Sequence, residues 1–318
     1  MRRLQRLRRT APLRDLCAET NFGAAQLVQP LFLDAAASGS RPIPGMQDNQ
    51  THAADGLLAQ VEADLAAGVR QFLLFAVPAQ KQERDFELEF ACRAIERIRA
   101  RCGDTASLWV DTCLCSHTHS GHCCLFDARG QQDLPGTLDA LAGFALAYAA
   151  AGADGIAPSD MNDGRVDHLR SRLDAAGHDL VPIMSYSSKF ASQLYGPFRV
   201  AAQSTPQHGD RRGYQLDVRS RREALAASQR CADEGVDLLM VKPGLTAIDL
   251  LAPIATATGL PVGAYQVSGE YASLALLARE GLGDFDRLLL ETWLVMRRAG
   301  ASFVITYGAR RARDLGLH

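Results

Sequence analysis

The chain has 318 residues, of which 47% are hydrophobic and 22% are charged, and its formal net charge is -2. A globular protein with a sizeable core fits this composition, whereas a protein that binds nucleic acid through an extended basic face does not. No apolar run reaches the roughly 18 residues of a membrane-spanning helix, and the N-terminus lacks the apolar stretch of a secretory signal. We therefore expect a soluble, cytoplasmic protein that binds neither nucleic acid nor membranes.

The chain begins with a basic cluster, MRRLQRLRRT. Because the chain as a whole is near neutral, this cluster favours a solvated arm over a nucleic-acid contact. We expect residues 1–26 to form an N-terminal arm that packs on a partner subunit. Residues 27–318 contain no low-complexity linker and are expected to form one catalytic domain.

Eight short apolar and β-branched runs follow as candidate strands. They cover residues 27–33, 72–77, 107–114, 155–161, 181–186, 238–243, 261–267 and 303–308. Segments with helical periodicity lie between most of them and end near a glycine that suits a left-handed C-cap. The clearest segments cover residues 56–68, 137–153, 222–235 and 272–281.

Buried strands that alternate with helices predict a parallel sheet. Eight such units in about 300 residues predict a closed TIM (β/α)8 barrel, an α/β fold. A doubly wound open sheet is the alternative, but no G-x-G-x-x-G motif follows the first strand.

Catalytic residues of such a barrel lie at the C-terminal ends of its strands. Unusual polar residues follow the predicted strands at this end: Asp111, Ser159, Asp160, Ser185, Lys189, Lys242, Tyr265, Ser268 and Tyr307.

The third strand runs into DTCLCSHTHSGHCC, residues 111–124. Cys113, Cys115 and Cys123 fit the pattern C-x-C-x7-C, and three thiolates with one open position would hold Zn2+ as a catalytic Lewis acid. Four protein ligands would instead make a closed structural site. The fourth ligand could be another residue of the loop: Cys124, His117, His119 or His122. Reduced thiols without a metal are the remaining alternative.

Lys189 lies just past the predicted fifth strand, and Lys242 ends the sixth. Two ammonium groups in a half-buried barrel mouth lower each other's pKa through repulsion and desolvation. A neutral amine is what Schiff-base formation with a substrate carbonyl requires. For either lysine alone, a solvated surface charge would be the simpler interpretation.

Side chains that suit a substrate carboxylate surround the lysines. They are Arg199, Arg211, Gln215, Tyr265 and Ser268. Residues 200–218 are polar, flanked by glycine and without helix or strand pattern, which suggests either an active-site lid or a plain surface loop.

From about residue 27 to 308, the chain resembles the porphobilinogen synthase (5-aminolevulinate dehydratase) family. The resemblance is densest in DTCLC with GHC, APSDMNDGRV, IMSYSSKFAS, YGPFR, GDRRGYQ, MVKP, AYQVSGEYA and RAGASFVITY. It implies a TIM barrel and a homo-octamer in which the N-terminal arm embraces a neighbour. It also implies a hydro-lyase that condenses two 5-aminolevulinate molecules into porphobilinogen, on the way to tetrapyrroles such as haem.

The resemblance also implies residue roles. Lys242 would form the Schiff base with the substrate that becomes the propionate side of the pyrrole, and Lys189 that with the acetate-side substrate. Asp111 and Ser159 would lie beside a catalytic zinc held by the three cysteines Cys113, Cys115 and Cys123. Tyr265, Ser268 and Tyr307 would bind the propionate-side carboxylate, and Arg199, Arg211 and Gln215 the acetate-side one.

Some segments depart from the family pattern. Residues 116–124 read SHTHSGHCC where the family has E-Y-T-x-H-G-H-C-G, so the loop histidine moves by one position and Cys124 replaces a glycine. The segment REALAASQR has alanine or serine where many bacterial members carry an allosteric magnesium carboxylate, which argues against stimulation by Mg2+. Two alternatives therefore stay open. One is a paralogue that converts 5-aminolevulinate or a similar amino ketone to another product in a specialised pathway. The other is a non-catalytic zinc-binding assembly protein.

Overall fold

The computed structural model describes residues 17–20 and 22–317. Eight parallel strands form the expected barrel, and each neighbours the next one along the chain. They are β1 (Leu27–Asp34), β4 (Gln71–Val77), β5 (Ser107–Thr112), β8 (Gly155–Pro158), β9 (Met184–Lys189), β10 (Leu238–Lys242), β11 (Val262–Tyr265) and β12 (Phe303–Ile305). β12 returns to pair with β1, while an isolated bridge between Ile156 of β8 and Ile183, the residue before β9, joins the other two edges. The barrel is therefore nearly closed, and the TIM-barrel prediction is confirmed.

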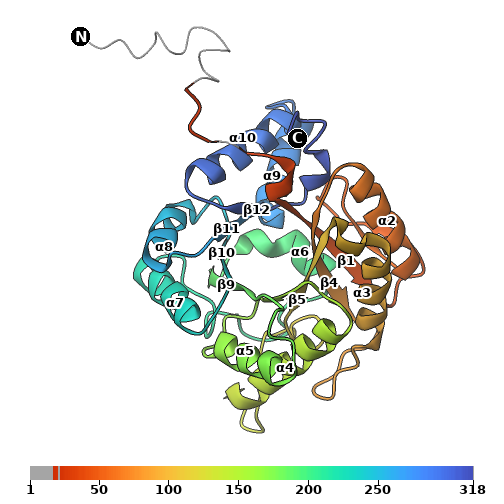
Figure 1. The fold of residues 1–318 in the computed structure, drawn as a ribbon, viewed down its shortest axis with the longest axis vertical. Coiled ribbons are helices and arrows are strands. Elements are labelled where there is room, and N and C mark those ends of the chain that lie inside the picture. The colour runs from red at the N-terminus through yellow and green to blue at the C-terminus, as the bar shows by residue number, and fades with distance from the viewer. Residues whose placement is uncertain (1–16, 21, 318) are drawn as a thin grey trace.

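Helices surround the ring of strands in Figure 1. They are α2 (Ala54–Ala66), α3 (Glu89–Cys102), α4 (Leu134–Ala150), α5 (Arg165–Ala175), α7 (Arg221–Asp233), α8 (Leu251–Thr258), α9 (Ser268–Arg279) and α10 (Phe285–Arg298). A further helix is α6 (Gly196–Ala201). Helix α6 lies inside the ring in this view. Its Phe198 ring packs on Phe32 and Phe75, from β1 and β4, with ring centroids 5.9 and 5.0 Å away. Helix α6 thus closes part of the barrel mouth.

Short elements complete the chain. The strands are β2 (Ser40–Pro42), β3 (Gln50–His52), β6 (Leu125–Phe126) and β7 (Gln132–Asp133). The 3-10 turns are η2 (Ala24–Gln26), η3 (Gly103–Thr105), η4 (Gln193–Tyr195), η5 (Ile248–Leu250) and η6 (Ala309–Arg311). None of the helices in the described part of the chain combines the length and the apolar character that crossing a membrane requires.

The strands are apolar because both of their faces are covered, one by the barrel interior and one by helices. All residues of β1 are buried, for example. The fifth strand differs from the prediction, because it covers Met184–Lys189 and not 181–186. Pro182 precedes it and has no N–H to donate to a strand ladder, so only its carbonyl pairs, accepting from Ile156. The strand also extends beyond its predicted end, so Lys189 is its last residue.

Residues 1–16 and 21 of the expected N-terminal arm lie outside the described residues. Phe22 packs on Trp293 of α10, with ring centroids 6.3 Å apart, and under the Arg297 guanidinium at 5.7 Å. The described end of the arm therefore lies on α10 of its own chain. The proposed contact with a partner subunit stays a prediction.

Candidate active site

The two lysines predicted from the sequence end neighbouring strands. Lys189 and Lys242 are Cα partners in the pairing of β9 with β10, and both side chains are buried. The ammonium nitrogen of Lys242 lies 3.9 Å from the centre of the Tyr265 ring and 4.9 Å from that of Phe198. Lys189 donates a hydrogen bond to the carbonyl oxygen of Ser159.

Burial and charge act together on the Lys242 amine. Removal from water lowers its pKa well below the usual value, and the nearby Lys189 charge lowers it further. Asp111 and the thiol groups act in the opposite direction but more weakly. Its surroundings therefore favour the neutral amine of Lys242, which is the state that attacks a carbonyl.

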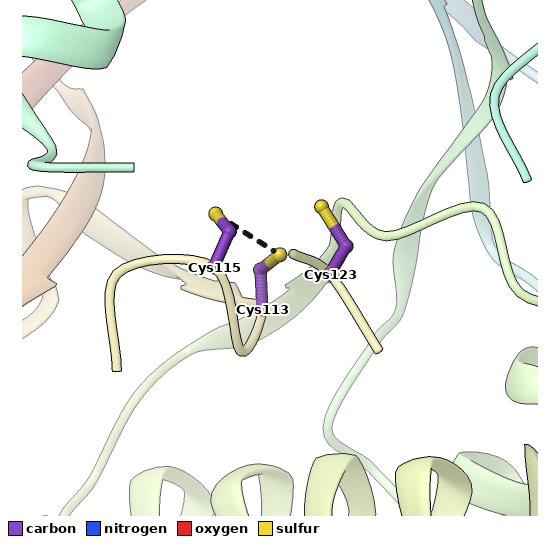
Figure 2. Close-up of side chains that lie close together, drawn as sticks. All are labelled: Cys113, Cys115 and Cys123. Atoms are coloured by element: carbon purple, nitrogen blue, oxygen red, sulfur yellow. Dashed lines mark hydrogen bonds between the residues drawn. The ribbon is translucent and has the colours of Figure 1, made fainter. Parts of the chain in front are cut away.

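The three cysteines of the C-x-C-x7-C pattern come together in the loop after β5. Figure 2 shows their sulfur atoms on the same side of the loop. The Sγ atoms of Cys113 and Cys115 are 3.3 Å apart, and all three Sγ atoms lie within 4.8 Å of one another. In the described part of the chain, these cysteines form the group of side chains that is close enough to share a metal ion.

This donor set fits zinc. Three thiolates are common zinc ligands, and three protein ligands leave a fourth position open. Hydrogen bonds from Cys113 and Cys123 lower the pKa of Cys115 well below its usual value, and the positive charges of Arg211 and Lys189 add to this effect. The surroundings therefore favour a thiolate in the loop.

The other candidate ligands of the loop have different surroundings. The His117 ring packs on the Phe144 ring at 4.7 Å, and His119 is exposed. Both ring nitrogens of His122 are engaged, Nδ1 with the Tyr214 hydroxyl and Nε2 with the His208 carbonyl, each at 2.9 Å. Burial raises the pKa of Cys124 to about 12, which disfavours its thiolate. This arrangement favours three protein ligands over four.

Asp111 interacts with Cys115 and with both lysines, and Ser159 contacts Asp111 and Lys189. Burial and the Cys115 charge raise the pKa of Asp111 to about 7. Its Oδ1 atom is buried without a hydrogen-bond partner among the described residues. Ser159 follows β8, its N–H donates to Thr112 of β5 and its carbonyl accepts from Lys189.

Three of the predicted carboxylate-binding residues line the side of Lys242. Tyr265 ends β11, and its hydroxyl lies 3.1 Å from that of Tyr307, which follows β12. Ser268 begins α9, accepts a hydrogen bond from the Phe198 N–H at 3.0 Å and donates to the Leu194 carbonyl at 3.3 Å. Its hydroxyl thus attaches the α6 segment to α9.

The other three lie on the α6 segment and on the loop that follows it. Several of their polar atoms are buried without a partner among the described residues: Arg199 Nε, Arg211 Nε, and Gln215 Oε1 and Nε2. Burying such atoms unpaired is costly, so they indicate where a polar ligand would bind. Arg211 also donates to the carbonyls of Gly121 and Ser204. Gly121 belongs to the loop of residues 113–124 that carries the cysteines, here called the cysteine loop, so this bond fastens the two loops to each other.

The segment that was expected to be irregular, residues 200–218, lies against the loop that carries the cysteines. After α6 ends at Ala201, no further helix or strand is formed before α7 within this described stretch, apart from the isolated bridge between Phe190 and Leu216. The Tyr214 hydroxyl accepts from the Cys123 N–H at 3.1 Å. The segment packs on the cysteine loop and is more than a plain surface loop.

Tyr186 lies beside both lysines, although the sequence pattern does not predict it there. Its ring centre lies 5.0 Å from the Lys242 ammonium nitrogen and 5.4 Å from that of Lys189, and its buried hydroxyl has no partner among the described residues. Regular alternation would place Tyr186 and Lys189 on opposite faces, because they are three residues apart, but the register shift in β9 brings both side chains to the same side.

The whole chain is similar to one family. A family model of delta-aminolevulinic acid dehydratase matches residues 1–315. A delta-aminolevulinic acid dehydratase of Halalkalibacterium halodurans is 39% identical over 313 residues, covering 97% of this chain and 95% of that protein. One from Helicobacter pylori is 37% identical over 319 residues, covering 99% and 98%.

A solved structure gives the same result. The crystal structure of delta-aminolevulinic acid dehydratase (porphobilinogen synthase) from Toxoplasma gondii, in complex with the reaction product porphobilinogen, matches with a TM-score of 0.92. The two sequences are 36% identical, and the match covers 99% of this chain and 91% of that one.

Proposed function

Because the chain belongs to the delta-aminolevulinic acid dehydratase family, we propose that it condenses two molecules of 5-aminolevulinate into porphobilinogen. The observation that carries this proposal is the pairing of two buried lysines, Lys189 and Lys242, beside three convergent thiols. A hydro-lyase of this kind would serve tetrapyrrole biosynthesis.

Each lysine would hold one substrate. Its neutral amine attacks the ketone carbon and water leaves, which forms a Schiff base. The protonated Schiff base makes the neighbouring C–H acidic, so one substrate can become an enamine and attack the other. Holding both substrates side by side turns a bimolecular condensation into an intramolecular one, a gain of up to about 7–11 kcal/mol in the barrier.

The carboxylates would fix the orientation of the two substrates. Tyr265, Ser268 and Tyr307 would bind the carboxylate of the substrate on Lys242. Arg199, Arg211 and Gln215 would bind that of the substrate on Lys189. The unpaired nitrogen atoms of Arg199, Arg211 and Gln215 support this role, because a carboxylate would accept the hydrogen bonds that they have to donate.

Cys113, Cys115 and Cys123 would hold the zinc ion, with Asp111 and Ser159 close by. A zinc ion with an open coordination position supplies Lewis acidity. Asp111, with a pKa of about 7, is suited to accept and return a proton near neutral pH. An allosteric Mg2+ is not part of the proposal. We further propose a cytoplasmic homo-oligomer, an octamer by family resemblance.

Product analysis tests this function. Zinc-loaded protein is incubated with 5-aminolevulinate, and the product is identified by mass and by the Ehrlich colour reaction for a pyrrole, with Lys242→Ala as the blank. Porphobilinogen from the wild type alone is expected. Another condensation product would favour the paralogue, and no turnover together with no borohydride-trapped adduct would rule out the Schiff-base mechanism for this substrate.

A further inference from the structure

The turn that follows β8, residues 159–164, touches both parts of the site. Its Ser159 carbonyl accepts a hydrogen bond from Lys189. Three residues later, the Asn162 side chain donates from Nδ2 to the carbonyl oxygen of Cys123 at 3.0 Å. The turn is thus in direct contact with a candidate Schiff-base lysine and with a candidate zinc ligand.

The turn is fixed by a fully buried ion pair. Asp160 Oδ2 lies 3.6 Å from Arg165 Nε, and both side chains are inaccessible to solvent. Arg165 also donates to the Ser185 hydroxyl at 2.9 Å and to the Tyr186 carbonyl at 3.2 Å, which fastens the turn to β9. The backbone of Met161 has a φ of 83°, in the left-handed region that side chains rarely adopt. Such a conformation persists only where the surroundings hold it.

Hydrogen bonds at both ends of its amide fix the orientation of the Asn162 side chain. Its Oδ1 accepts from Gln132 Nε2 at 2.5 Å, and its Nδ2 donates to Asp160 Oδ1 at 2.6 Å as well as to Cys123. The backbone N–H of Asn162 donates to the same Asp160 oxygen at 2.7 Å. The residue is 1% exposed, and both donor hydrogens of its side-chain amide are used.

Cys123 needs such support because its place is not set by local structure. Seven residues separate it from Cys115, and no helix or strand lies among them. The Tyr214 hydroxyl accepts from its N–H, and Asn162 donates to its carbonyl. The two contacts hold the peptide groups on both sides of the Cα atom and so restrict the direction of the thiol.

We propose that Asn162 is a positioning residue for the metal site, which holds the Cys123 carbonyl so that the thiol of Cys123 faces those of Cys113 and Cys115. This inference rests on the proposed zinc site. Replacing a residue that orients a metal ligand typically weakens metal binding by about 10-fold to 100-fold.

Zinc affinity provides the test. The probe is Zn2+ alone, titrated against a chromophoric chelator with the full-length reduced protein. Asn162→Leu, which keeps a similar volume and removes the amide, is expected to bind zinc about 10-fold to 100-fold more weakly. Gln132→Ala, which frees the orientation of the amide, is expected to show a smaller loss. The double variant should bind no more weakly than Asn162→Leu alone.

Asn49→Leu is the matched control. Asn49 is also a buried asparagine, but its side chain donates to the carbonyls of Gln47 and Tyr307 and not to the cysteine loop. This variant is expected to lose stability and to keep the zinc affinity of the wild type. A loss of zinc affinity in Asn162→Leu that matches the loss in Asn49→Leu would overturn the proposal.

Folded Asn162→Leu protein with wild-type zinc affinity would also overturn it. If Asn162→Leu does not fold, Gln132→Ala decides, because weaker zinc binding supports the positioning role and unchanged binding contradicts it. Borohydride trapping of 5-aminolevulinate is measured in parallel. Its failure in the wild type would remove the proposed Schiff-base chemistry, while the zinc comparison between variants would still decide the role of Asn162.

Discussion

Lys189 and Lys242 face each other across β9 and β10 because β9 contains one extra residue. Leu239 pairs with Ser185, but Val241 pairs with Ser188, so the register shifts between these pairs. Without the shift, Lys242 would pair with Ser188. A β-bulge of this kind redirects side chains and is frequent beside active sites. The pairing of the two amines is thus built into the backbone of the barrel.

Replacing Lys242 should abolish the chemistry. Lys242→Met removes the amine with the lowered pKa, and we expect product formation to fall by about 10³-fold or more. Borohydride-trapped adducts, identified by peptide mass, are expected on Lys242 and Lys189 in the wild type and on Lys189 alone in the variant. An adduct found on neither lysine in the wild type would contradict the assignment.

The same variant should change how stability depends on pH. The pKa of Lys242 is lowered on folding from 10.5, so the unfolded chain binds the extra proton and the wild type gains stability as the pH rises towards 10.5. Lys242→Met lacks this dependence and avoids burying the amine. Its excess stability over the wild type should therefore shrink between pH 7 and pH 10 in urea titrations. Parallel curves would contradict the lowered pKa.

Lys189 should act on Lys242 through its charge. Lys189→Met removes the repulsion that helps to lower the pKa of Lys242. Adduct formation at Lys242 should then require a higher pH, which is measured as the borohydride-trapped fraction against pH. Lys189→Arg keeps the positive charge and serves as the control, with a profile close to that of the wild type. Identical profiles in Lys189→Met and the wild type would exclude the coupling.

Cysteine variants should separate the proposed zinc ligands from their neighbour. Cys123→Ala removes one of three thiols and is expected to weaken zinc binding by more than about 100-fold, with loss of product formation. Cys124→Ala should keep the zinc affinity, because that thiol lies outside the three-cysteine group and burial raises its pKa to about 12. Equal losses in the two variants would show that Cys124 is also a ligand.

The buried ion pair beneath the site should matter for stability. Arg165→Met leaves the Asp160 carboxylate buried without its counter-charge, and the free energy of unfolding should fall by about 3–5 kcal/mol. Adding Asp160→Asn removes the uncompensated charge and keeps an oxygen that can accept from Asn162, so the double variant should regain part of the loss. Denaturant titrations of the four proteins measure this coupling. Strictly additive losses would mean that the two charges do not interact.

The sequence by itself determined the barrel and most of the candidate residues. Apolar runs that alternate with helical segments identify a parallel sheet, because each strand must be buried on both faces. Residues such as Lys242 and Tyr265 could then be assigned to strand ends, where the structure has them. The spacing of Cys113, Cys115 and Cys123 was enough to predict that they converge, because all three belong to one loop.

Only the tertiary structure decided how these residues meet. The extra residue in β9 has no local signal, since register depends on hydrogen bonds to the neighbouring strand, and it turns Lys189 towards Lys242. Asn162 and Cys123 are 39 positions apart, and their contact depends on two loops that fold against each other. Periodicity in a sequence reports which face of an element is buried, whereas the direction of a loop side chain is set by contacts that are distant along the chain.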